Sequence, residues 1–256
     1  MATKPLLSIS ELLEQSWQHV RENADSLTKR TSLFVLLALI SFGLNLIAYA
    51  FPDTISPGVR LLDLLLIQLI GAGYVSMRLT QLILSQETGD KKIEAEGGKA
   101  FPRYVWVSIL TFLATLGGAF VFVLPGIWLV VVLSFATLLS LEDRRTGTQA
   151  LAASAELVKG RWWATLVRLI VPGFLLLCLY FLVTNVLNGL VTLIAGYSPS
   201  QIVADYAANY WWSMPPKQIL FAFTANQAIG SIAMALFAPL FIAVTTRLFH
   251  DLKKTA

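Results

Sequence analysis

Long runs of apolar residues constrain this chain more than any other feature of its sequence. Six runs lie near residues 31–50, 60–85, 103–124, 126–141, 163–195 and 217–249. A membrane-spanning helix needs about 20 predominantly apolar residues, which most of these runs supply. Charged residues make up only 13% of the chain, against about 25% in an average soluble domain. The sequence therefore predicts a single all-α integral membrane domain over residues 1–256, built as a six-span helix bundle.

The third and fourth runs are joined only by Leu124-Pro125-Gly126, which is too short for a hydrated loop. Proline ends a helix and glycine permits the turn that follows it. The fourth run corresponds to roughly 24 Å of helix, which is short for a complete span. A re-entrant hairpin over 103–141 is therefore an alternative to two crossing helices.

Basic residues are distributed unevenly between the two sides of this bundle. Fifteen Lys and Arg fall in the N-terminal segment, the connections after the second and fourth runs and the C-terminal end, whereas the opposite side holds Arg60 and Lys217. The positive-inside rule then places both termini in the cytoplasm. We expect a multi-pass protein of the bacterial inner membrane. Because the basic residues are confined to these connections, we expect no nucleic-acid partner.

Two segments between the runs have the pattern of amphipathic helices on the cytoplasmic surface. Ser8 and Glu11 have capping-box spacing at the start of the first segment. In the second segment Thr148 can cap a helix over 148–159, Ser154 lies on its apolar face, and Gly160 can end it. The two segments align at an offset of 138 residues, and a weaker copy precedes the third run. We therefore expect an internal repeat with units near 8–85, 91–141 and 148–249.

Basic and aromatic residues beside these helices suit the membrane interface, where cations meet headgroups and indole rings straddle the boundary. The residues that we expect to contact headgroups are Trp17, Arg21, Arg30, Arg103, Lys159, Arg161, Trp162 and Trp163. Membrane lipids are accordingly the expected partners. The aromatic-rich outer connection 196–216 has the composition of an interfacial anchor, with a substrate lid as the alternative.

Several polar residues interrupt the apolar runs: Asn45, Gln68, Arg78, Gln81, Asn185, Asn188, Asn226 and Gln227. Polar groups are costly in hydrocarbon, so they usually face the interior of a helix bundle or a water-filled cavity. Two interpretations follow, namely hydrogen bonding between helices or a polar transport path. Asp63 lies near the outer end of the second run, where it can reach headgroups.

The residues needed for enzyme chemistry are sparse. His19 and His250 are the only histidines, Cys178 is the only cysteine, and none of them belongs to a metal-ligand motif. The chain also lacks a phosphate-binding loop, a nucleophile elbow and a close carboxylate pair inside a run. We therefore expect no enzyme activity, no cofactor and no metal.

The stretch 124–163 carries a recognisable pattern. Pro125, Gly126 and Ile127 open a run, a short charged turn follows, and an Ala-Leu, Ser, Leu, Gly pattern falls at Ala150, Leu151, Ser154, Leu157 and Gly160. This pattern resembles the YciC-type family of bacterial inner-membrane proteins, which is related to the membrane domain of some glycerophosphoryl diester phosphodiesterases. Gln149 stands where Glu is common in that pattern. The resemblance implies a six-helix membrane domain of unassigned activity, without the phosphodiesterase domain.

Two functions are compatible with these features. The first is a non-enzymatic inner-membrane protein that interacts with lipids, with a membrane-protein partner or with further copies of itself. The alternative is a small-solute transporter or channel subunit with an amide-lined path. The amphipathic cytoplasmic helices favour the first, because such helices can lie in an anionic leaflet.

Overall fold

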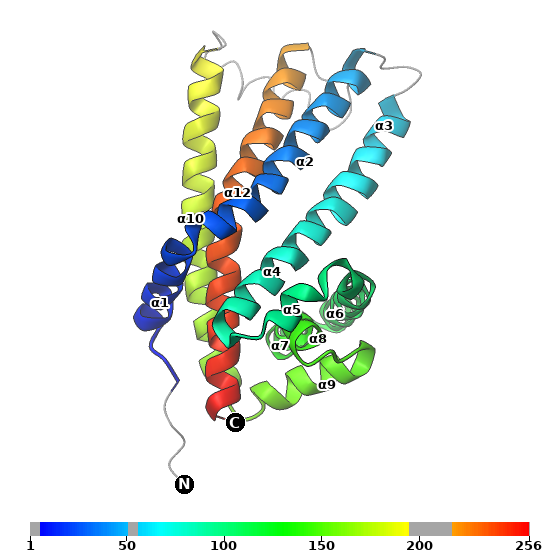
Figure 1. The fold of residues 1–256 in the computed structure, drawn as a ribbon. Helices are drawn as coiled ribbons and strands as arrows, with labels where there is room; N and C mark the ends of the chain where they lie inside the picture. The colour runs from blue at the N-terminus through cyan, green and yellow to red at the C-terminus, as the bar shows by residue number, and fades with distance from the viewer. Residues whose placement is uncertain (1–5, 51–55, 195–216, 256) are drawn as a thin grey trace. The chain divides into compact units, whose positions relative to one another are not determined.

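The computed structural model describes residues 6–50, 56–194 and 217–255, where every regular element is helical (Figure 1). The elements are α1 (Ile9–Glu22), α2 (Ala24–Ala50), α3 (Ser56–Leu62), a π-helix (Asp63–Gly71), α4 (Ala72–Thr88), α5 (Lys91–Ala95), a 3-10 turn (Gly97–Ala100), α6 (Phe101–Val121), α7 (Val123–Leu133), α8 (Ala136–Glu142), α9 (Gly147–Val158), α10 (Trp162–Ile194) and α12 (Lys217–Thr255). The expected interfacial helix in the connection 196–216 lies outside the described residues.

Five helical segments in the described ranges are long and apolar enough to cross a membrane. They are Ala24–Asn45, Gly97–Phe120, Val123–Glu142, Trp162–Val191 and Ala228–Thr255. They coincide with the first, third, fourth, fifth and sixth predicted runs, and they indicate a multi-pass membrane protein. The predicted helical fold class is thus confirmed at this level.

The second predicted span, 60–85, does not form one long α-helix. It is divided among α3, the nine-residue π-helix and α4, which holds only 17 residues. At Gly71 an added Cβ would lie 3.1 Å from the Leu37 side chain of α2, so the glycine permits close approach there. Residues 64–70 of this run are apolar except for Gln68, so they carry no periodicity that could distinguish α from π winding.

The connection between α6 and α7 differs from the prediction. The turn is made at Phe122, which is extended (φ −161°, ψ 151°), and not at Leu124-Pro125-Gly126. Pro125 lies in the first turn of α7, where proline is tolerated because its missing N–H would have no helical partner. Gly126 serves the contact between the helices, since a Cβ there would lie 2.8 Å from Cα of Ala119. The fourth run is itself interrupted at Ser134 and Phe135, between α7 and α8.

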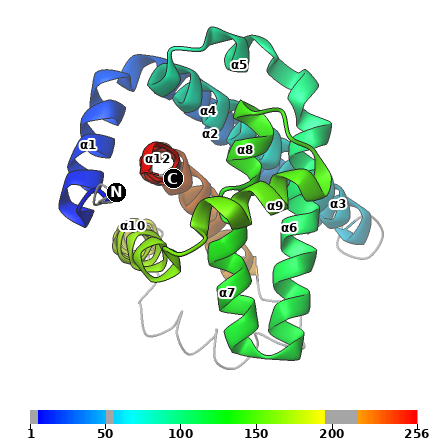
Figure 2. The same cartoon turned by 90° about the horizontal axis from the view of Figure 1, so that it is seen from below.

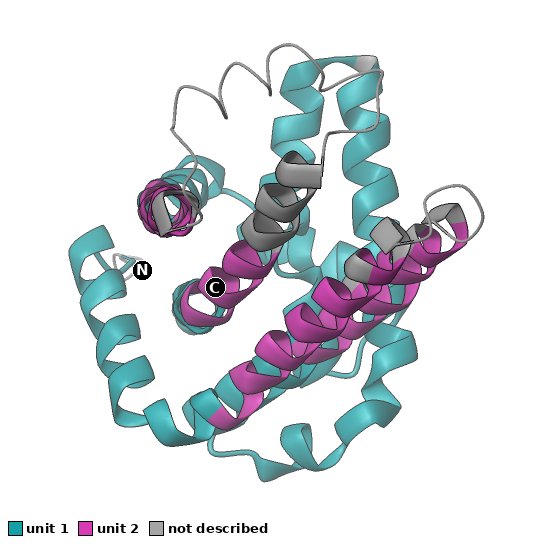
Figure 3. Cartoon of the chain, turned by 90° about the horizontal axis from the view of Figure 1, so that it is seen from above, with its two compact units in different colours: residues 1–28, 76–176, 238–256 teal, residues 29–75, 177–237 magenta. Residues whose placement is uncertain are grey.

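The chain packs as two compact units (Figure 3). Unit 1 comprises residues 1–28, 76–176 and 238–256, and unit 2 comprises residues 29–75 and 177–237. Side chains from α1, α4, α7, α8, α9 and α12 form the core of unit 1, including Leu12, Met77, Phe135, Val158 and Phe249. In unit 2 the Tyr180 hydroxyl donates to the Gly230 carbonyl over 3.4 Å, and its ring packs edge-on against Phe237. The units do not follow the limits of the expected repeat, which stays a prediction.

The amphipathic segments form helices that pack against this core. α1 has the predicted capping box between Ser8 and Glu11, and its Leu12 and Ser16 are fully buried. α9 ends as predicted before Gly160, whose φ of +76° suits glycine. The predicted cap at Thr148 is wrong, because α9 begins one residue earlier, at Gly147, after Thr146. Gly147 has a φ of +51°, a backbone conformation that carries the chain sharply into the helix.

Candidate functional site

The last turns of α12 carry a network of charged side chains that the sequence interpretation did not anticipate. We call it the α12 charge cluster: Glu87, Glu142, Asp143, Arg247, His250 and Lys253. His250 lies between two carboxylates, with Nδ1 3.1 Å from Glu87 and Nε2 3.2 Å from Glu142. Lys253 donates to Glu142 at 2.8 Å and to Asp143 at 3.0 Å. The cluster thereby joins α4 and the end of α8 to α12.

The spacing in α12 explains how one helix supplies the cations. Arg247, His250 and Lys253 recur every three residues, so they lie along one side of the helix. Arg247 approaches Glu87 at 3.2 Å as an ion pair without hydrogen-bond alignment, and its Nη1 donates to Gln15 of α1 at 3.0 Å. The Glu87 side chain is only 7% exposed, and a buried carboxylate needs such partners.

This arrangement suits charge compensation between helices. No group of three or more His, Cys, Asp and Glu side chains that could hold a metal ion is found in the described part of the chain. The sequence interpretation assigned no site role to His250 or to the other members of the cluster. The three-residue spacing of Arg247, His250 and Lys253 was the available signal, but their partners come from distant elements.

Two further arginines of unit 1 bind the ends of the chain. Arg168 donates from Nε to the Leu7 carbonyl at 2.7 Å, and the Leu7 amide donates to Asp251 at 2.7 Å. Arg161 donates to the side chain and carbonyl of Thr255. Arg161 was expected at headgroups, and the structure instead places it in contact with the end of α12.

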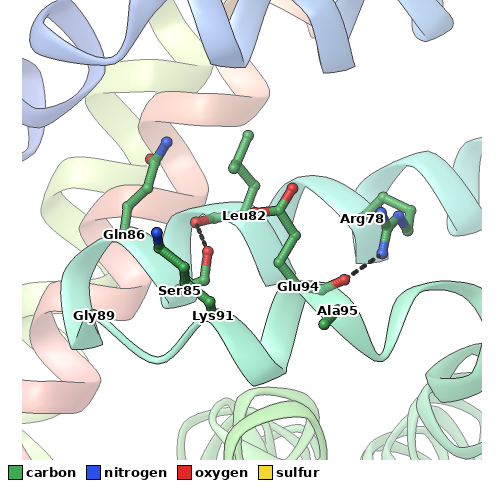
Figure 4. Close-up of a pocket in the computed structure, with 8 residues that line it drawn as sticks. All are labelled: Arg78, Leu82, Ser85, Gln86, Gly89, Lys91, Glu94 and Ala95. Carbon is green, nitrogen blue, oxygen red and sulfur yellow. Dashed lines mark hydrogen bonds between the residues drawn. The ribbon is translucent and has the colours of Figure 1, made fainter.

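A pocket of about 620 Å³ lies between α4 and α5 in unit 1 (Figure 4). Its lining is Arg78, Leu82, Ser85, Gln86, Gly89, Lys91, Glu94 and Ala95. Arg78 donates to the Gln81 side chain at 2.8 Å and to the Glu94 carbonyl at 3.1 Å. Both acceptors are neutral, so these hydrogen bonds position the guanidinium. The side chain of Glu94 also lines the pocket, and Lys91, the first residue of α5, is exposed. The pocket can accept an anionic group that also offers polar atoms to Ser85 and Gln86.

The other residues expected at headgroups fall into two groups. Trp17, Arg21, Lys159 and Trp163 are exposed, and Arg30 and Trp162 are partly exposed. Trp162 and Trp163 stack edge to face with ring centroids 4.5 Å apart. Arg103 instead makes a paired contact with Glu96, at 3.1 and 3.0 Å, and donates to the Ser140 carbonyl. The exposed residues of this set are therefore accessible to the lipid headgroups that the sequence predicts as their contacts.

The residues of the predicted polar path are divided between the two units, and the path stays a prediction. In unit 1, Arg78 and Gln81 contact each other. In unit 2, Asn45 donates to Ser41 at 2.9 Å and approaches Asp63 at 3.4 Å. Asn185 is exposed and donates to the Phe181 carbonyl of its own helix, while Asn188 is partly exposed. The side chains of Gln68, Asn226 and Gln227 lie outside the described residues.

Asp63 is the polar residue that the sequence interpretation underestimated. It was expected to reach headgroups, but it is only 6% exposed. Its Oδ1 atom has no hydrogen-bond partner among the described residues. It also begins the π-helix, a form of winding that is often found at functional sites.

Comparisons with protein-family models, with curated proteins and with solved structures find no match to this chain.

Proposed function

We propose that this chain is a non-enzymatic, multi-pass protein of a bacterial inner membrane that binds phospholipid headgroups in the unit 1 pocket. The observation that carries this proposal is the presence of two cationic side chains, Arg78 and Lys91, in the lining of the pocket between α4 and α5. Guanidinium and ammonium groups both bind phosphate well. The leucine and alanine in the lining suit the glycerol and first methylenes of a lipid. The resemblance to the YciC-type family is part of this proposal and agrees with a membrane role.

The location of the basic residues supports a lipid at this position. Lys91 follows the second apolar run directly, on the side where the basic residues gather. A lipid phosphate at that boundary lies near several positive charges, each worth about 1 kcal/mol of attraction to an anionic leaflet. Exposed Trp17 and Trp163 are suited to the same boundary.

Native mass spectrometry of the protein in mild detergent with added dioleoyl-phosphatidylglycerol tests this proposal. We expect Lys91→Gln to weaken lipid retention roughly tenfold, because one charged contact to phosphate is lost. Arg78→Gln should weaken it at least as much. Lys254→Gln is the matched control, since Lys254 is an exposed lysine in the last turn of α12 and does not line the pocket. Equal lipid retention by wild type, Lys91→Gln and Lys254→Gln would count against the proposal.

A transporter or channel subunit is the second candidate, and Asp63 is the observation that favours it. A buried carboxylate with an unsatisfied oxygen is expensive in hydrocarbon, and it often marks an ion or proton pathway. Asn45 and Ser41 lie beside it in unit 2, where they could contribute to a cation site.

Flux measurements separate this candidate from the lipid-binding proposal. Protein in phosphatidylglycerol-containing vesicles should dissipate an imposed proton or sodium gradient if Asp63 lies on a pathway. Asp63→Asn should abolish that flux, whereas Asp25→Asn, which changes an exposed carboxylate at the start of α2, should leave it unchanged. Flux that survives Asp63→Asn excludes the Asp63 pathway.

A further inference from the structure

The hairpin formed by α6 and α7 is apolar on nearly all sides over its outer part. Its exposed residues include Phe112, Leu113, Leu116, Phe120, Phe122, Val123 and Leu124, and Phe120 is 83% exposed. A helix that is apolar all round belongs in a protein core or in hydrocarbon. Because these side chains are not covered within the chain's described part, lipid hydrocarbon is the environment that suits them.

The direction of this hairpin differs from that of its neighbours in unit 1. In Figure 1, α6 and α7 are seen along their axes, while the unit 1 parts of α10 and α12 run lengthwise through the view. Figure 2, turned by 90°, shows the hairpin lengthwise and the other two helices end-on. The hairpin therefore runs across α10 and α12. If α10 crosses the bilayer, helices that run across it lie along the membrane plane.

A hydrogen bond between two tryptophans sets the depth of the hairpin relative to the start of α10. Trp162, the first residue of α10, donates from Nε1 to the Trp128 carbonyl of α7 over 3.4 Å. Trp128 is six residues from the turn at Phe122, which is roughly 9 Å of helix. The hydrocarbon core of a bilayer is about 30 Å thick. From the level at which α10 begins, the turn of the hairpin cannot reach the opposite surface.

The locations of the exposed tryptophans agree with a shallow position of the hairpin in the membrane. Trp106 on α6, Trp128 on α7 and Trp163 on α10 are all exposed, and Trp163 is 73% exposed. Trp106 also lies beside Gly147, where α9 begins. Indole rings favour the boundary between headgroups and acyl chains. Tryptophans on both arms of the hairpin and at the start of α10 thus mark one boundary.

We infer that the α6–α7 hairpin does not cross the membrane but lies in one leaflet, against its acyl chains, on the side where α10 begins. Of the two alternatives for residues 103–141, two crossing helices or a re-entrant hairpin, the second then holds, with the hairpin inserted from one side. The crossing helices are then α2, the continuous helical stretch from α3 to α4, α10 and α12. Their even number keeps both termini on the same side. The inference rests on the membrane-spanning role of α10 that the proposed function assumes.

Depth measurements on single-cysteine variants test it with a matched internal control. In a Cys178→Ala background, cysteines at Ile109 and Phe120 of α6 carry an environment-sensitive fluorophore. Cysteines at Ile170 and Phe181 of α10 form the control pair, because both pairs are eleven residues apart and exposed. Quenching by lipids with spin labels at different depths, in phosphatidylglycerol-containing vesicles, then gives the depth of each position.

We expect the α10 positions to differ in depth by about 16 Å, as eleven residues of a crossing helix require. The α6 positions should differ by less than about 5 Å, because a helix in the membrane plane changes depth little along its length. If the two α6 positions differ in depth as much as the two α10 positions do, the inference is wrong, because α6 then crosses the membrane. The protein would still be a multi-pass membrane protein. Absence of quenching at both α6 positions would also overturn it, since the hairpin would then lie outside the lipid. Absence of a depth difference along α10 would remove the multi-pass premise itself.

Discussion

Ser154 joins α9 to the interruption between α7 and α8 through its hydroxyl group. The hydroxyl donates to the Val132 carbonyl at 2.7 Å and accepts from the Phe135 amide at 3.2 Å. Both backbone groups lose helical partners where the helix is interrupted, so one fully buried side chain satisfies two groups at once. Ser154 therefore stabilises a position where the backbone would otherwise carry unpaired polar atoms.

Replacement of Ser154 by Glu should destabilise the protein strongly, because a carboxylate would be forced into a contact without space or compensating charge. Ser154→Ala should cost about 1–3 kcal/mol, the usual penalty for leaving buried polar groups unpaired. Thermal unfolding in detergent measures both effects. Gln149→Glu is the control, since Gln149 is exposed on the same helix. Equal stability of the two glutamate variants would contradict the assignment of faces in α9.

His19 predicts a dependence of stability on pH. It is buried on α1, and burial lowers the pKa of its imidazole below the ordinary value. The carboxylate of Glu87 acts in the opposite direction, while Arg247 adds to the lowering. The folded state therefore favours the neutral ring. Its contribution to stability is complete above the unfolded pKa of about 6.5, and it is lost as the pH falls toward the folded pKa.

Acidification from about pH 7.5 to about pH 5.5, a range that brackets the ordinary imidazole pKa, should therefore remove the part of the stability that His19 contributes. Over this range the unfolding temperature of His19→Gln should change less unfavourably than that of wild type, because the glutamine side chain does not titrate. Circular dichroism of the helical signal can follow both unfolding transitions. An identical change in the two proteins would show that His19 does not contribute to the pH dependence.

At the scale of elements, Gly126 lies in the contact between α6 and α7. A Cβ on Gly126 would lie 2.8 Å from both Cα and Cβ of Ala119, and the Cα cannot move aside without moving its helix. Gly117, on the same hairpin, has no atom within 4 Å of such a Cβ. The two glycines thus form a matched pair that differs in packing.

Gly126→Ala should separate the two helices at a cost of about 1–3 kcal/mol, the usual range for overpacking. Gly117→Ala should be neutral or slightly stabilising, because alanine favours the helix by up to about 1 kcal/mol over glycine. Hydrogen–deuterium exchange of peptides from α6 and α7 measures the effect. Faster exchange in Gly126→Ala alone is the expected result, and faster exchange in both variants would contradict the contact.

Local signals predicted the elements well wherever they were strong. The capping box at Ser8, the stop at Gly160 and five of the six long apolar runs appear in the described parts of the structure. The interruption at Phe135 and the π-helix did not follow from the sequence, since apolar runs look alike whether their winding is regular or not. The turn at Phe122 was missed because proline ends one helix as readily as it starts another.

The candidate site was harder to predict, because it depends on contacts between parts of the chain that are far apart in the sequence. Arg78 and Lys91 stood out as basic residues near an apolar run, but the pocket that they line depends on how α5 folds back on α4. The carboxylates around His250 come from residues 108 and 163 positions away in the chain. Such pairs depend on tertiary packing, which the spacing of residues along one helix does not contain.

At the scale of the whole molecule, the distribution of basic residues predicts the orientation. Cysteines introduced at Ser8, Gly98 and Thr148 of a Cys178→Ala protein are at exposed positions, and they should react only with reagents that reach the cytoplasm. A cysteine at Ser200, which lies outside the described residues, should react from the other side. Labelling of intact and of inverted membrane vesicles with an impermeant maleimide makes the comparison. Reaction of Thr148→Cys from outside would reverse the orientation.

The shallow α6–α7 hairpin adds apolar side chains to one leaflet only. Side chains such as Phe112 and Phe120 displace acyl chains in the leaflet that holds the hairpin. Material inserted into one leaflet expands that leaflet, and such insertion is easier where the leaflet is already stretched by curvature. The hairpin should therefore insert most readily where the leaflet that holds it lies on the convex side of a curved membrane.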